Sequence, residues 1–267
     1  APQRTITDPK NNGFLLLLGL DAPSGSDPLK AGYERKPGEQ DLSESQACMS
    51  EHEVKAAASG SASTSGIVGG WFKSADPIAQ MKTGLDPLRP LLAKERVALS
   101  RYQQFLGMPF DDWGFGQILS PNCEQILLTH RLYVIDGFNQ DLGSGVARLE
   151  KDMESWRTVL GQSKTLMVKM LAVGAVQDDV KLASSVLTRS DADAAVIGRL
   201  SKLVRPLDQL ELSIRWPMQS QFAWATQNVA ADLKKYSREE HPFYVSMAAA
   251  MPLPVQRRAN AYAEYYE

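Results

Sequence analysis

The sequence is poor in the residues that build metal and redox sites. Only three histidines and two cysteines occur among its 267 residues. The cysteines, Cys48 and Cys123, match neither a zinc-binding nor a Cys-x-x-Cys spacing. The tripeptide Glu51-His52-Glu53 has no second histidine one helical turn later, which the HExxH arrangement of a helical zinc site requires. We therefore expect no metal site and no cofactor.

The sequence also has no excess of either charge and no long apolar run. Its formal net charge is −2 and its pI is near 6.0, which argues against an electrostatic nucleic-acid partner. No run of about 18 apolar residues is present, so no segment has the pattern of a membrane-spanning helix. The hydrophobic content of 43% and charged content of 22% are those of a globular protein with a sizeable core.

Motifs for nucleophilic or phosphate chemistry are missing as well. The serine-rich stretch at residues 60–66 lacks the strand-to-helix context of a nucleophile elbow. His130 and Asp136 fall on one expected helix, six residues apart, and therefore on different faces. His130 is more simply a histidine of the core or its rim. No glycine-rich loop is long enough to hold a phosphate group. The residues thus supply no convergent catalytic set.

What the sequence does contain is a long helical pattern between Ser144 and Val173. Steps of three and four residues meet Val146, Leu149, Met153, Trp156, Leu160, Ser163, Met167 and Met170. All but one of these are apolar, which is the stripe of an amphipathic helix that packs against other helices. The residues expected on its solvated face are Glu150, Lys151, Asp152, Glu154, Arg157 and Lys164. Ser144 is placed to cap the first turn.

Further helical patterns surround this stretch. They cover residues of about 85–105, 121–138, 176–188, 192–204 and 206–233. Pro217 interrupts the last pattern and predicts a kink near Ser213. We predict an all-α fold, a helical bundle of about six to eight helices with a loop-rich N-terminal arm.

The chain is expected to divide near residue 70. Residues 1–70 form the N-terminal arm, with short docked helices such as the apolar run after Gly13, and a Gly/Ser/Ala-rich exposed loop over 57–70. Residues 71–267 form the helical bundle domain, which begins with Trp71-Phe72 as an anchor on the core.

Two further groups of residues are candidate sites, one catalytic and one for an apolar ligand. Asp111 and Asp112 precede Trp113 in a glycine-bounded loop, which resembles a sugar-binding corner and is the candidate catalytic site of a hydrolase. Turn formation and a hydrophobic plug are the plainer interpretation of these residues. An apolar ligand site is conceivable among Met153, Trp156, Met167 and Met170, although core packing explains the same spacing.

The C-terminal stretch has the composition of a binding surface. Its arginines and tyrosines are Arg257, Arg258, Tyr262, Tyr265 and Tyr266. These two residue types are the ones that protein interfaces use as anchors. A terminal helix folded back on the bundle is the alternative interpretation. We expect these residues to bind a protein partner.

Several stretches together resemble a family of uncharacterised proteobacterial cell-envelope proteins. The resemblance lies in residues 13–29, 101–106, 149–157, 169–170 and 256–263, which match in order as well as in content. Members of that family carry an N-terminal membrane anchor followed by a helical extracytoplasmic part. The resemblance implies a periplasmic protein, anchored to the inner membrane in full length, with the anchor removed from this chain. It also favours a Cys48–Cys123 disulfide over two free thiols.

These observations lead to one functional expectation and one alternative. We expect a non-enzymatic periplasmic module that binds a protein partner in the cell envelope, such as an immunity protein, inhibitor or adaptor for a secreted enzyme. The alternative is a hydrolase that acts on an envelope polymer or lipid at the loop of Asp111, Asp112 and Trp113.

Overall fold

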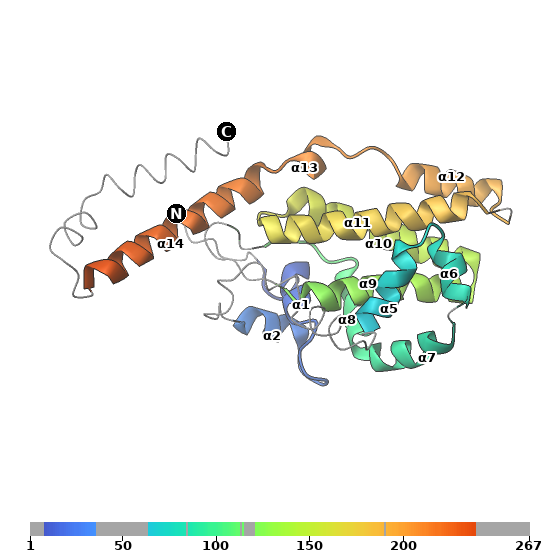
Figure 1. Cartoon of the computed structure of the whole chain (residues 1–267), viewed down its shortest axis with the longest axis horizontal. Helices are drawn as coiled ribbons and strands as arrows, with labels where there is room; N and C mark the ends of the chain where they lie inside the picture. The colour runs from blue at the N-terminus through green and yellow to red at the C-terminus, as the bar shows by residue number, and fades with distance from the viewer. Residues whose placement is uncertain are drawn as a thin grey trace.

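The computed structural model describes residues 8–35, 64–83, 85–112, 114, 121–189 and 191–238. Regular structure in these ranges is helical throughout, without a strand, which confirms the predicted all-α fold (Figure 1). The helices are α1 (Gly13–Leu18), α2 (Pro28–Glu34), α5 (Thr64–Lys73), α6 (Pro77–Thr83), α7 (Leu85–Lys94), α8 (Arg96–Phe105), α9 (Cys123–Gln140), α10 (Leu142–Gln162), α11 (Leu166–Leu187), α12 (Ala194–Leu203), α13 (Gln209–Leu212) and α14 (Arg215–Arg238).

The centre of the bundle is formed by the three long helices α9, α10 and α11 (Figure 1). Helix α10 begins after Asp141, whose side chain accepts a hydrogen bond from the Ser144 N–H. The apolar stripe predicted for this helix is buried at Val146, Leu149, Met153, Trp156 and Leu160, each at most 1% exposed. The stripe packs against α9 on one side and α11 on the other.

The prediction of one continuous helix up to Val173 is wrong. Helix α10 ends before Ser163, whose ψ of 136° is extended, and α11 begins three residues later. The turn is held from outside, because Asp112 accepts hydrogen bonds from the backbone N–H groups of Lys164 and Thr165. Met170 therefore belongs to α11 and is 63% exposed.

The N-terminal helices are docked tightly on the bundle, as expected for the run after Gly13. All six residues of α1 are buried. Its contact with α2 requires glycine, because a Cβ on Gly32 would lie 1.9 Å from the carbonyl oxygen of Leu15. The buried guanidinium of Arg101 donates hydrogen bonds to the carbonyl groups of Leu20, Ala22, Pro23 and Ser26. One side chain of α8 thus fixes the loop between α1 and α2.

The exposed loop predicted over residues 57–70 is wrong from Thr64 onward. Helix α5 begins at Thr64, and its Val68 is fully buried against the core. Packing of α5 on α9 overrides the small, polar composition of this stretch. Trp71 and Phe72 are buried at the end of α5, which confirms their predicted anchor role. Residues 57–63 lie outside the described ranges.

The pattern predicted as one kinked helix from 206 onward forms two helices. The chain is extended at Ser213, between α13 and α14. Pro217 lies in the first turn of α14, where its missing N–H costs little, so it is accommodated at the start of the helix and does not bend it. Helix α14 leads away from the bundle (Figure 1). A membrane-spanning candidate is absent from the described helices, which are each too short or too polar for that role.

Candidate functional site

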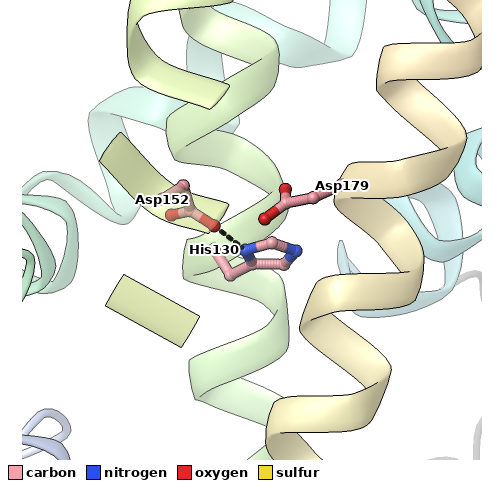
Figure 2. Close-up of side chains that lie close together, drawn as sticks. All are labelled: His130, Asp152 and Asp179. Carbon is pink, nitrogen blue, oxygen red and sulfur yellow. Dashed lines mark hydrogen bonds and ion pairs between the residues drawn. The ribbon is translucent and has the colours of Figure 1, made fainter. Parts of the chain in front are cut away.

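Three fully buried titratable side chains meet at the centre of the bundle. His130 comes from α9, Asp152 from α10 and Asp179 from α11, and each residue is 0% exposed (Figure 2). One potential ligand atom from each side chain lies within 4.8 Å of the other two. We call these three residues the His130 cluster. It is the group of residues in the described ranges whose donor atoms match a metal site.

Asp152 is the best-bonded member of the His130 cluster. Its Oδ2 lies 2.7 Å from His130 Nδ1, a hydrogen bond in which the carboxylate accepts. Its Oδ1 accepts a hydrogen bond of 2.7 Å from the Tyr102 hydroxyl. The Tyr102 oxygen in turn accepts one of 2.6 Å from Trp156 Nε1–H. The Asp152 carboxylate is therefore held by His130 at one oxygen and by Tyr102 at the other, with Tyr102 itself held by Trp156.

Asp179 and one side of His130 lack such bonds. Neither carboxylate oxygen of Asp179 accepts a hydrogen bond, and His130 Nε2 forms none. The Nε2 atom lies 3.9 Å from Asp178 Oδ2, beyond hydrogen-bond distance. That oxygen accepts a hydrogen bond of 2.6 Å from Arg131 Nε. The His130 cluster is thus bonded on its Asp152 side and unsatisfied on its Asp179 side.

The electrostatics of the His130 cluster follow from its burial. Burial raises the pKa of Asp179 well above its usual value. The charge of Asp152 raises it further, as does the hydrogen bond to Asp152 that a protonated Asp179 can donate. Burial and the same neighbouring carboxylate also raise the pKa of Tyr102. Two carboxylates beside one imidazole require either a proton or a cation to offset their charge.

The helical spacing of the sequence carries a signal for the His130 cluster. Asp152 lies three residues after Leu149 and four before Trp156, so helical spacing places it on the buried stripe. Asp179 lies three residues after Val176 and three before Leu182, which places it on the buried face of its helix in the same way. The assignment of Asp152 to the solvated face of its helix is therefore wrong. His130 is buried, as expected, but its partners come from two other helices.

A second buried polar group lies beneath α13, and we call it the α13 anchor. It consists of the buried residues Arg157, Lys169 and Glu211, together with Arg205, whose side chain is half exposed. Arg157 Nε and Nη2 donate hydrogen bonds of 2.7 Å to the two oxygens of Glu211. Lys169 Nζ donates to the carbonyl groups of Leu160 and Glu211 at 2.5 and 2.8 Å. Arg205 also donates hydrogen bonds to the two oxygens of Glu211, at 3.1 and 3.0 Å.

Every charged group of the α13 anchor has bonding partners. Burial by itself raises the pKa of Glu211, but hydrogen bonds from Arg157, the Asp208 N–H and Arg205 outweigh it and lower the pKa to about 2. Asp208 and Glu211 also form a reciprocal capping box around the start of α13. The anchor therefore fixes this four-residue helix against α10 and α11.

The polarity of α13 is inverted relative to an ordinary surface helix. Glu211 is only 4% exposed, whereas its neighbours Leu210 and Leu212 are 66% and 63% exposed. Ile214 and Trp216 follow at 56% and 47%. We call Leu210, Leu212, Ile214 and Trp216 the α13 edge. Burying the charged residue and exposing its apolar neighbours is the opposite of what solvation alone favours.

A charged groove adjoins the α13 edge. Its volume is about 640 Å³, and it lies between α10, α12 and α13. Basic residues along it include Arg199, Lys202 and Arg205, and acidic ones include Glu150 and Glu154. Arg199 pairs with Glu150 across it through two hydrogen bonds. The groove thus gives the edge a border of both charge signs.

The two described aspartates of the predicted hydrolase site, Asp111 and Asp112, bind other residues of the chain. Asp112 is 1% exposed and accepts hydrogen bonds from the Lys164 and Thr165 backbone and the Thr165 hydroxyl. Burial raises its pKa to about 6, although these bonds oppose the shift. Asp111 forms an ion pair with the Lys164 ammonium group. Trp113 lies outside the described residues. Both carboxylates join their loop to the α10–α11 turn, and the hydrolase alternative stays a prediction.

The other predicted sites can be placed only in part. Arg257, Arg258, Tyr262, Tyr265 and Tyr266 lie outside the described residues, as do Cys48 and residues 51–53. Cys123 is buried at the start of α9 and is not a free thiol. Because Cys48 lies outside the described residues, the Cys48–Cys123 disulfide stays a prediction.

The apolar ligand site is not formed as expected. Met153 and Trp156 are buried, but Met170 is 63% exposed on α11. These side chains consequently do not line a common internal cavity with Met167.

Comparison with known proteins gave no match to a family model, a curated protein or a solved structure. The resemblance to cell-envelope proteins therefore remains an expectation drawn from the sequence.

Proposed function

We propose that the protein is a non-enzymatic protein-binding module of the cell envelope that docks its partner on the α13 edge. The observation that carries this proposal is the inverted polarity of α13, with Glu211 buried and Leu210 and Leu212 exposed. Exposed apolar groups that lie next to one another mark interaction sites more often than isolated ones. An inhibitor or adaptor of a secreted enzyme is the concrete form of this role.

Rigid presentation supports a docking role. Arg157 holds the Glu211 side chain of α13 and Lys169 holds the Glu211 carbonyl group, and both residues are at least nine-tenths buried. A side chain on a fixed backbone loses less conformational entropy when it binds, which favours affinity. Trp216, at the end of the edge, is the residue type that most often dominates the binding energy of an interface.

The occupant that fits this surface is a protein with an apolar row of side chains bordered by charges. The edge offers a central apolar contact, and the adjoining groove offers Arg199, Lys202 and Glu154 at its rim. An apolar centre with a polar rim is the usual composition of a protein interface. The envelope location rests on the sequence resemblance.

The test is affinity capture from an envelope extract, followed by titration of the captured protein in purified form. Leu212→Asp and Trp216→Ala should weaken binding by about tenfold or more, because the first places a charge in the apolar row and the second removes its largest apolar side chain. Ile197→Asp is the matched control, since Ile197 is 42% exposed on α12, away from the edge. Circular dichroism melting verifies that each variant is folded.

Two results would overturn the proposal. One is a partner that binds the edge variants as tightly as the unmodified chain. The other is a concentration-dependent dimer that Leu212→Asp abolishes, which would assign the edge to a second copy of the chain. The variant Arg257→Ala with Arg258→Ala tests the predicted C-terminal binding residues in the same assay.

A further inference from the structure

The His130 cluster combines complete burial with unused bonding capacity. Neither oxygen of Asp179 accepts a hydrogen bond, although both are buried. Buried polar atoms in native proteins nearly always have partners, and a carboxylate that accepts no hydrogen bond has its lone pairs available to a cation. We propose that the His130 cluster binds a divalent transition-metal cation such as Zn²⁺, with His130, Asp152 and Asp179 as its ligands.

The chemistry of the three ligands suits such an ion. One imidazole nitrogen and two carboxylate oxygens form a donor set that Zn²⁺, Mn²⁺ and Fe²⁺ accept. A neutral His130 and the ionised Asp152 and Asp179 together carry a charge of −2. A divalent cation cancels that charge, which leaves a neutral complex in the core and removes the electrostatic cost of burying two carboxylates.

The geometry requires only small side-chain adjustments. The potential ligand atoms lie within 4.8 Å of one another. An ion bound about 2.1 Å from each ligand atom separates the atoms by about 3 to 3.5 Å. Asp179 reaches from α11 toward the His130–Asp152 pair (Figure 2). Binding through Nδ1 exchanges the hydrogen bond between His130 and Asp152, now 2.7 Å long, for two bonds to the metal.

The surroundings resemble the second layer of residues around a metal site. The Tyr102 hydroxyl fixes one oxygen of Asp152 and is itself fixed by Trp156. Asp178, held by Arg131, lies on the far side of the His130 ring. The hydrogen bonds of Tyr102 and Trp156 are of the kind that orients metal ligands and raises metal affinity. Since α9, α10 and α11 each supply one ligand, a bound ion joins the three central helices.

Complete burial determines how the site must be tested. A site without solvent contact takes up its metal as the chain folds, so the ion has to be present during synthesis. The full chain is therefore produced in zinc-supplemented medium and in chelator-depleted medium. We expect one zinc ion per chain in the first preparation by mass spectrometry of the metal content, together with a higher melting temperature than in the second.

Two variants connect the ion to this cluster. Asp179→Asn keeps the shape of the side chain and removes its charge, and Asp179→Leu removes its ligand atoms. Both should lower the zinc content by about tenfold or more and abolish the difference in melting temperature between the two media. Asp112→Asn is the control, because Asp112 is an equally buried aspartate outside the cluster. It should retain its zinc even if its melting temperature falls.

The proposal is overturned if the zinc-supplemented preparation contains no more metal than the depleted one. It is also overturned if the Asp179 variants bind as much zinc as the unmodified chain, because the ion then lies elsewhere. Neither outcome affects the docking role of the α13 edge.

Discussion

The α13 anchor and the His130 cluster are both buried polar groups, but they differ in how fully their atoms are bonded. In the α13 anchor, Arg157 and Lys169 donate to Glu211 or to carbonyl groups at 2.5 to 2.8 Å. In the His130 cluster, neither oxygen of Asp179 accepts a hydrogen bond, and its one possible bond is the one that it donates to Asp152 when it is protonated. The anchor balances charges of both signs, whereas the cluster places two carboxylates beside one imidazole.

This difference separates a structural role from a ligand-binding one. A fully bonded buried ion pair holds its elements in place, and removing one partner leaves the other charge uncompensated. An unbonded carboxylate in the core gives the fold nothing by itself, because a leucine of similar volume would pack there at no electrostatic cost. The reason for an aspartate at position 179 must then lie in what it binds.

The largest effect is expected from Glu211→Leu. This change leaves Arg157 and Lys169 buried without their counter-charge, and it should lower the free energy of unfolding by about 3 to 5 kcal/mol. Urea denaturation measures it. Glu150→Leu is the matched control, since the Glu150–Arg199 pair is more exposed and worth less than about 1 kcal/mol. Equal losses in the two variants would contradict the assigned role of the anchor.

The α13 anchor should also make the protein sensitive to acid. The folded-state pKa of Glu211 is about 2, below its usual value of 4.5, so the ionised form is stabilised by folding. That stabilisation is complete above about pH 4.5 and is lost as the pH falls toward 2, by on the order of 3 kcal/mol. Urea denaturation at several pH values should show that the free energy of unfolding of Glu211→Gln falls less steeply with acid than that of the unmodified chain. An equally steep fall in the variant would exclude Glu211 as the source of the acid sensitivity.

A smaller loss is expected from Tyr102→Phe, on the bonded side of the His130 cluster. The variant removes the donor to Asp152 and the acceptor for Trp156, at a cost of about 1 to 3 kcal/mol. Thermal unfolding measures the difference. Tyr133→Phe serves as control, because Tyr133 packs on the Tyr102 ring at 5.7 Å without bonding to the cluster. If the control loses as much, the effect comes from removing a tyrosine hydroxyl in general and not from the bonds of Tyr102 to Asp152 and Trp156.

The smallest effect is expected from Asp179→Leu in protein prepared without metal. Removing an unbonded buried carboxylate should change the free energy of unfolding by less than about 1 kcal/mol, or raise it. Urea denaturation in the presence of a chelator measures this value beside that of Glu211→Leu. A loss as large as that of Glu211→Leu would remove the distinction between the two polar groups.

The all-α fold was predictable because its evidence is local. Helical spacing in residues 144–162 places Val146, Leu149 and Trp156 on one face, and these residues are buried. The same spacing places Arg157 on that face, between Met153 and Leu160, and Arg157 is buried as well. Its assignment to the solvated face is wrong because its partner, Glu211, lies 54 residues away.

The candidate site was harder to predict because its residues meet only through tertiary packing. His130 and Asp152 lie 22 residues apart on separate helices, and no motif connects them. The boundary of α5 depended on packing in the same way, since the composition around Thr64 favours a loop. Local patterns thus predict which elements form, whereas long-range contacts decide which polar groups those elements bring together.

The hydrogen bonds of Asp112 have a consequence for how the two longest central helices can behave. At the bend between α10 and α11, the Thr165 N–H donates to the side chain of Asp112, 53 residues earlier in the chain, and residues 163–165 contain no glycine or proline. An excised peptide of residues 142–187 lacks that side chain, and its apolar stripe continues through the bend. Such a peptide should therefore form one straight rod, so the hairpin is a property of the assembled bundle and not of its own sequence.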